Sequence, residues 1–118
     1  MTDSHHIVAI VPARDLEAST AFYGRLGLRL VSDYGDYRIL SDDRGWRLHL
    51  RLSLDWPARV EDNPLGLYLY VEDVDAVAAR MRDLMIDPAD PRPKPWGCYE
   101  FAVSDPDGAL VRVGRVIG

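Results

Sequence analysis

A short run in the first half of the chain alternates leucines with side chains that carry nitrogen donors. Arg47, His49 and Arg51 occupy every second position between residues 46 and 53. This period of two places them on one face of a strand and the leucines on the other. The leucine face must pack against a helix, so the other face is open. Because guanidinium groups bind carboxylates and phosphates through paired N–H donors, this face is predicted to bind an anion.

Other segments bring aromatic and polar residues to the same open side. Tyr68 and Tyr70 alternate with leucines, and Arg112 lies between two valines. Aromatic rings beside arginines suit a flat ligand that carries a carboxylate or phosphate. With two tryptophans from flanking loops, the predicted ligand-binding residues are Arg47, His49, Arg51, Trp56, Tyr68, Tyr70, Trp96, Glu100 and Arg112.

Two of these residues are candidates for catalysis. A histidine can act as a general base near neutral pH, which makes His49 one candidate. Glu100 is the other, as a general acid or base in a desolvated setting, with an ion pair to an arginine as the alternative. The arginines could also lie at an exposed rim, paired with acids. Cys98 is expected to be a small buried hydrophobic residue.

The first half of the chain carries signals for a strand, a helix and three more strands. A β-branched run ends at Pro12, Asp15 is a helix N-cap, and Gly27 is a helix stop. Turn-rich pieces separate the later strands. The predicted elements are a strand over Ile7–Val11, a helix over Leu16–Leu26, and strands over Arg29–Asp33, Tyr37–Leu40 and Trp46–Ser53.

The second half repeats this order. A shift of 58 residues places Ile7 on Leu65 and Asp15 on Asp73. The predicted elements are a strand over Leu65–Val71, a helix capped by Asp73 and running to Met85, an extended edge or loop through Pro88, Pro91, Pro93 and Pro95, and strands over Cys98–Ser104 and Ala109–Val116 that form a hairpin at Asp105-Pro106-Asp107-Gly108. We therefore predict an α+β fold of two βαβββ modules (about 5–54 and 64–116) joined by a linker over residues 55–63, as one domain over residues 1–118.

Composition excludes several classes of protein. The chain has 118 residues, of which 47% are hydrophobic and 28% charged, and its net charge is −5. This charge disfavours a nucleic-acid partner. No apolar run approaches the ~20 residues of a membrane span, and the N-terminus lacks the pattern of a signal peptide. We therefore expect a cytoplasmic protein without a membrane partner. A single cysteine rules out an intrachain disulfide or a multi-cysteine metal site.

Three stretches together resemble the vicinal-oxygen-chelate superfamily, also called the glyoxalase/bleomycin-resistance/dioxygenase group. They are residues 11–28, residues 69–75, and residues 95–97 with 103–108, and the resemblance runs from about Ile7 to Val113. It implies a cup-shaped sheet with helices on the convex side and a pocket on the concave side. It also implies a homodimer, whose pocket in the bleomycin-resistance branch forms between subunits.

Metal-dependent members of this family hold a divalent ion with four ligands on the concave face. The corresponding positions here are Val8, His49, Gly66 and Arg112. Only His49 has a side chain that can ligate a metal. A shifted alignment adds only His6, which with His5 is expected to lie in a solvated N-terminus. The sequence therefore predicts no metal and no other cofactor.

The sequence leaves three functions open. The favoured one is a small-molecule-binding protein, similar to the antibiotic-resistance branch, that sequesters an aromatic or anionic ligand in a homodimer cleft. The resemblance implies acidic clefts for cationic bleomycin, whereas the predicted face here is basic. The alternatives are a metal-dependent isomerase, lyase or dioxygenase, and a metal-free acid–base enzyme that uses His49 and Glu100. Whether the protein is an enzyme at all stays open.

Overall fold

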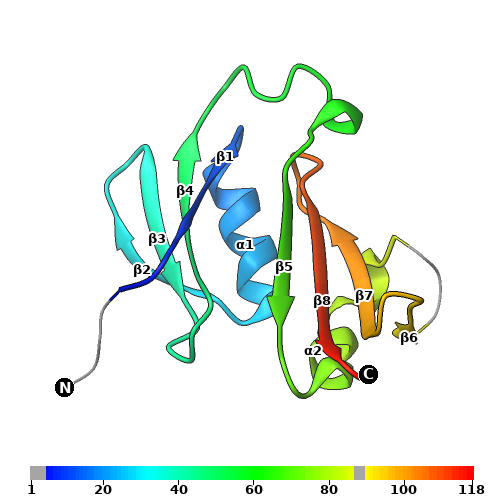
Figure 1. Cartoon of the computed structure of the whole chain (residues 1–118). Helices are drawn as coiled ribbons and strands as arrows, with labels where there is room; N and C mark the ends of the chain where they lie inside the picture. The colour runs from blue at the N-terminus through cyan, green and yellow to red at the C-terminus, as the bar shows by residue number, and fades with distance from the viewer. Residues whose placement is uncertain (1–4, 87–89) are drawn as a thin grey trace.

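The computed structural model describes residues 5–86 and 90–118, which form two modules of one helix and one four-stranded sheet each (Figure 1). The first sheet has the order β1-β4-β3-β2 and the second the order β5-β8-β7-β6. In each, the first strand runs parallel to its neighbour and the remaining pairs are antiparallel. The predicted α+β fold with a βαβββ repeat is confirmed.

The elements of the first module are β1 (Ala9–Ala13), α1 (Leu16–Leu26), β2 (Arg29–Asp33), β3 (Tyr37–Ser41) and β4 (Arg47–Leu52). A 3-10 turn, η1 (Val60–Asp62), lies in the connecting segment. The second module comprises β5 (Gly66–Tyr70), α2 (Val74–Met81), the 3-10 turn η2 (Arg82–Leu84), β6 (Arg92–Pro93), β7 (Cys98–Ser104) and β8 (Leu110–Val116). Pro88 lies outside the described residues.

The helix ends follow the predicted capping signals. The Asp15 carboxylate accepts hydrogen bonds from the backbone N–H groups of Glu17 and Ala18, at 3.0 and 3.1 Å. These groups have no partner within the helix, so the cap satisfies them. Gly27 ends α1 with φ of 118°, in the left-handed region that glycine adopts without strain. Asp73 caps α2 in the same way, by accepting from the backbone N–H of Ala76.

Two predicted boundaries were wrong. The first strand does not stop before Pro12 but spans Ala9–Ala13, and Ile7 lies outside it, 97% exposed. Because β1 is the edge of its sheet, a proline there can face away from the ladder without losing a hydrogen bond. The second helix was predicted to reach Met85 but ends at Met81, and the η2 turn follows. The chain must turn there because the N–H of Ile86 donates to the carbonyl of Ala102 on β7.

Each sheet has one covered face and one open face. Helix α1 contacts β2 and β4, and α2 contacts β7 and β8. Leu48 and Leu50 are buried beneath α1, whereas Arg47 and Arg51 are exposed on the opposite face of β4. The predicted assignment of faces on this strand is confirmed. No helix among the described residues is both long and apolar enough to cross a membrane.

The hairpin turn between β7 and β8 joins the second module to the first. Asp105 accepts a hydrogen bond from the hydroxyl of Tyr23 at 2.9 Å and bonds from two backbone N–H groups of its own turn. Asp107 pairs with Arg14 at 3.1 Å. Burial raises the pKa of Asp105 and that of Tyr23, so Asp105 depends on its three donors to remain buried as a carboxylate.

Replacement of Tyr23 by phenylalanine tests this contact. Tyr23→Phe removes one donor from a buried carboxylate, and we expect the free energy of unfolding to fall by about 1–3 kcal/mol. Urea unfolding followed by circular dichroism measures the change. Tyr34→Phe is the matched control because Tyr34 is 67% exposed, and it should change stability little. Equal stabilities of the two variants would contradict the proposed role of the Tyr23–Asp105 bond.

Candidate functional site

The open face of the first sheet carries the predicted basic residues on β4. Arg47 and Arg51 are exposed and His49 is half-buried between them. The strand register places His49 opposite Ile10 on β1 and opposite Ile39 on β3. The ring of His49 therefore lies in an apolar row that crosses the sheet, with a guanidinium group on either side along the strand.

The two arginines of this face have no carboxylate partner among residues 5–86 and 90–118. Arg47 contacts only the ring of exposed His6, at 3.0 Å, and Arg51 makes no side-chain bond within the described part of the chain. Most other described arginines do have a carboxylate partner. They are Arg14, Arg25, Arg29, Arg38, Arg59, Arg82 and Arg112. The first sheet therefore presents uncompensated positive charge on a protein of net charge −5.

The open face of the second sheet is organised around Glu100, whose side chain is buried. One carboxylate oxygen accepts hydrogen bonds from the Tyr68 hydroxyl at 2.9 Å and the Trp96 indole at 2.8 Å. The other pairs with Arg112 at 2.7 Å, which confirms the predicted ion pair between Glu100 and an arginine. Burial pushes the pKa of Glu100 upward, but these three hydrogen bonds outweigh it and hold the pKa below its ordinary value.

This cluster forms because β8, which lies between Tyr68 on β5 and Glu100 on β7, carries a glycine at the position where the Tyr68 side chain passes over it. Gly114 lies opposite Glu100 on β7 and Tyr70 on β5. A Cβ atom at this position would come within 2.5 Å of the Tyr68 hydroxyl and 2.6 Å of the Cβ of Glu100. Only a residue without a side chain lets Tyr68 reach over β8 to Glu100.

Aromatic rings cover the cluster. The guanidinium of Arg112 lies 5.5 Å from the centre of the Trp96 ring, within range of a cation–π contact. The rings of Tyr68 and Tyr70 lie 4.5 Å apart, and Tyr70 is 61% exposed. Burial raises the pKa of Tyr68, and the neighbouring Cys98 and the hydrogen bond to Glu100 raise it further. Cys98 is buried beside it, as predicted.

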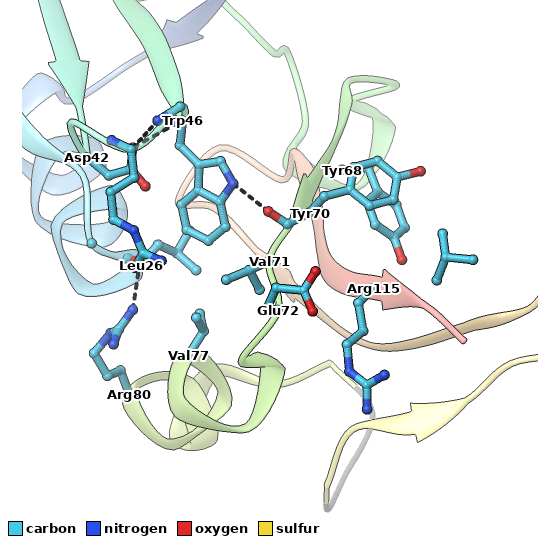
Figure 2. A pocket seen from close by; sticks show the side chains of 14 residues that line it. Leu26, Asp42, Trp46, Tyr68, Tyr70, Val71, Glu72, Val77, Arg80 and Arg115 are labelled. Atoms are coloured by element: carbon cyan, nitrogen blue, oxygen red, sulfur yellow. Dashed lines mark hydrogen bonds between the residues drawn. The ribbon is translucent and has the colours of Figure 1, made fainter. Parts of the chain in front are cut away.

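A groove of about 770 Å³ runs between the two modules (Figure 2). The indole N–H of Trp46 crosses it and donates to the carbonyl of Tyr70 at 2.9 Å. Charged side chains from both modules lie along its rim. The lining residues are Leu26, Gly27, Asp42, Arg44, Gly45, Trp46, Tyr68, Tyr70, Val71, Glu72, Val77, Arg80, Arg115 and Val116.

The predicted site residues fall into two groups on different sheets. Arg47, His49 and Arg51 share the first sheet, whereas the second sheet carries a bonded set that consists of Tyr68, Tyr70, Trp96, Glu100 and Arg112. No bond or ring contact joins the two groups within residues 5–86 and 90–118. Trp56 lies in the connecting segment, 41% exposed, and does not line the groove.

Sequence reasoning missed one partner on the first sheet. The hydroxyl of Tyr37 lies 2.7 Å from Nδ1 of His49, and their rings meet edge to face. Alternation along residues 37–40 places Tyr37 on the open face, but its pairing with His49 requires the register between two strands. His49 and Glu100, the predicted acid–base candidates, are not bonded to each other. His49 is hydrogen-bonded to Tyr37, and Glu100 to Tyr68.

The donor set does not fit the family's metal centre. Position 8 holds a valine and position 66 a glycine, and Arg112 is committed to Glu100. Among the described residues, no group of three or more His, Cys, Asp or Glu side chains is arranged to hold a metal ion. A catalytic divalent ion needs several such ligands with open positions for substrate.

Two modules of this order, each with one helix-covered face and one open face, define a small α+β protein with an internal repeat. A sequence profile of the Glyoxalase/Bleomycin resistance protein/Dioxygenase superfamily matches residues 4–113, and the chain belongs to this superfamily. No protein in the collection of characterised sequences matches it.

Solved structures share the fold. A bleomycin-binding protein in complex with bleomycin superposes with a TM-score of 0.81 at 21% identity, covering 95% of this chain and 98% of that one. A bleomycin resistance determinant encoded on the transposon Tn5 gives 0.81 at 21% identity, with coverages of 96% and 98%. A protein of unknown function from Agrobacterium tumefaciens gives 0.73 at 27% identity, with coverages of 99% and 98%.

Two glycine substitutions test the construction of the second sheet. Gly114→Ala forces a Cβ against Tyr68, Glu100 and the backbone of Tyr99, and should lower the free energy of unfolding by about 1–3 kcal/mol. Gly24→Ala is the control, because a Cβ there meets nothing within 4 Å and alanine favours the helix, for a gain of about 0.5–1 kcal/mol. Denaturant unfolding of both variants should show opposite signs. Unchanged stability of Gly114→Ala would mean that the cluster is not close-packed.

Proposed function

We propose that this protein binds and sequesters a small molecule with a flat, aromatic or other apolar body and an acidic group, without a metal ion. The observation that carries the proposal is the unpaired charge of β4. In the part of the chain that the structure describes, Arg47 and Arg51 have no carboxylate partner, whereas seven other arginines have one. An acidic ligand would supply the missing partner through charge-assisted hydrogen bonds.

The second sheet supports the apolar half of the ligand. Glu100 neutralises Arg112, so this central pair adds no net charge to the face. Exposed Tyr70 and Trp96 offer ring faces for stacking. One sheet would therefore hold the charge and the other the ring system. This division favours binding over the metal-free acid–base alternative, because Glu100 already bonds three donors and His49 bonds Tyr37.

The proposal includes a homodimer with the ligand clefts between subunits. Among the described residues of one chain no hydrogen bond, ion pair or ring contact joins the basic group of the first sheet to the Glu100 cluster of the second. A second copy could place the first sheet of one subunit across from the second sheet of its partner. Exposed Ile10, Tyr70 and Trp96 on these faces are the kind of side chains that subunit contacts bury. Pro12 on β1 and the Trp46 bond to Tyr70 on β5 blunt one edge of each sheet, the edge that β1 or β5 forms. The faces, rather than added strands, would then form the contact.

Matched ligands test the role of charge. Naphthoate and naphthamide have the same ring system, but only naphthoate is an anion. We expect naphthoate to bind at least about tenfold more tightly, and Arg51→Gln to remove most of this preference. Isothermal titration calorimetry measures both affinities. Arg59→Gln is the control because it makes the same change in net charge in the connecting segment. Equal binding of the two ligands, or equal losses in the two variants, would refute the proposed anion site.

Native mass spectrometry tests the assembly and the metal together. Protein dialysed against nickel, zinc, manganese and iron salts should be detected as a dimer of two chains. We expect no stoichiometric metal, because His49 is the only one of the four family ligand positions whose side chain can bind a metal. One metal per chain would show that the ligand positions are wrongly assigned. A monomer at micromolar concentration would contradict the proposed intersubunit cleft.

A further inference from the structure

Tyr37 and His49 form a bonded pair in the middle of the basic face. The register of β3 and β4 places Tyr37 opposite Arg51 and Ile39 opposite His49. Tyr37 therefore reaches diagonally to His49, and its hydroxyl oxygen lies 2.7 Å from Nδ1. The ring centres are 5.3 Å apart at an angle of 71°. Both side chains are half-buried, which shields this bond from competition with water.

The second module repeats this arrangement with different chemistry. On β8, Arg112 occupies the position that corresponds to His49, because it lies opposite Tyr68 on β5 as His49 lies opposite Ile10 on β1. The residue that reaches diagonally to Arg112 is Glu100, two positions before its direct neighbour Ala102. Tyr37 holds the same place two positions before Ile39. In both modules, therefore, a side chain of the adjacent strand fixes the central residue of the open face.

The chemistry of the pair sets the direction of its hydrogen bond. A phenol is a better donor than acceptor, and a neutral imidazole nitrogen without a proton is a good acceptor. The favourable bond is thus O–H to Nδ1, which leaves the imidazole proton on Nε2. We infer that Tyr37 is a positioning residue that holds His49 as an N–H donor, so that Arg47, His49 and Arg51 form one row of donors for the acidic group of the ligand.

This inference rests on the proposed function and sharpens the ligand class. A row made only of donors favours a group made only of acceptors, such as a carboxylate or phosphate, and disfavours an amide or amine at the same place. It also leaves neither nitrogen of His49 with a free lone pair, since Nδ1 accepts from Tyr37 and Nε2 carries the proton. The same bond would then disfavour metal ligation by the one residue suited to it.

The position of the proton can be measured without any ligand. Two-bond proton–nitrogen correlation spectra of histidine-labelled protein, recorded where imidazole is neutral, distinguish the two tautomers. The spectrum of His49→Gln identifies the His49 signals among those of His5 and His6. We expect the wild-type ring to carry its proton on Nε2 with a hydrogen-bonded Nδ1, and Tyr37→Phe to lose the hydrogen-bonded signature. A proton on Nδ1 in the wild-type protein would overturn the inference.

Binding then tests the consequence. Tyr37→Phe should lower the affinity for naphthoate by about three- to tenfold and leave the affinity for naphthamide nearly unchanged. The control is Tyr34→Phe, which removes the hydroxyl of an exposed tyrosine and should change neither affinity. If wild-type protein prefers naphthoate but Tyr37→Phe binds it equally well, the inference fails and the proposed anion site stands. If wild-type protein shows no preference, the proposed function fails, whereas the spectra still decide whether Tyr37 sets the proton of His49.

Discussion

The strict alternation of β4 is the constraint on which the two faces of the first module depend. Leu48 and Leu50 must pack beneath α1, and this requirement fixes which side chains remain outside. A slip of one residue would expose the leucines and bury Arg47, His49 and Arg51 without partners. Burial of an unpaired guanidinium is far more costly than its exposure, so the basic face follows directly from the core.

The two modules share one geometry, and the residue that fixes the central side chain of the open face differs in charge between them. Glu100 and Tyr37 occupy corresponding places, each beside the central residue of its open face. The carboxylate cancels the charge of Arg112, whereas the phenol adds no charge to the first sheet. Gly114 gives Tyr68 the space to complete the Glu100 cluster. A repeated scaffold thus presents one aromatic face built around an ion pair, and one face whose Arg47 and Arg51 have no carboxylate partner among the described residues.

Local signals in the sequence were sufficient for most of the fold. The Asp15 cap, the Gly27 stop and the strand alternation predicted elements that the structure confirms within one or two residues. The stop before Pro12 failed because a single strand does not reveal that it will lie at a sheet edge. The pairing of Tyr37 with His49 also escaped prediction, since alternation assigns a face but leaves the register between strands open.

Likeness of fold to bleomycin-binding proteins does not determine the ligand of this chain. At 21% identity the backbone can be kept while the side chains of the open faces change. Arginine cannot lose its charge, and Tyr37 orients His49 as a third donor within our proposal. A site of three donors repels cations and satisfies the several acceptor lone pairs of a carboxylate or phosphate. The chemistry of this face therefore argues for an anionic ligand, whichever ligands other members of the superfamily bind.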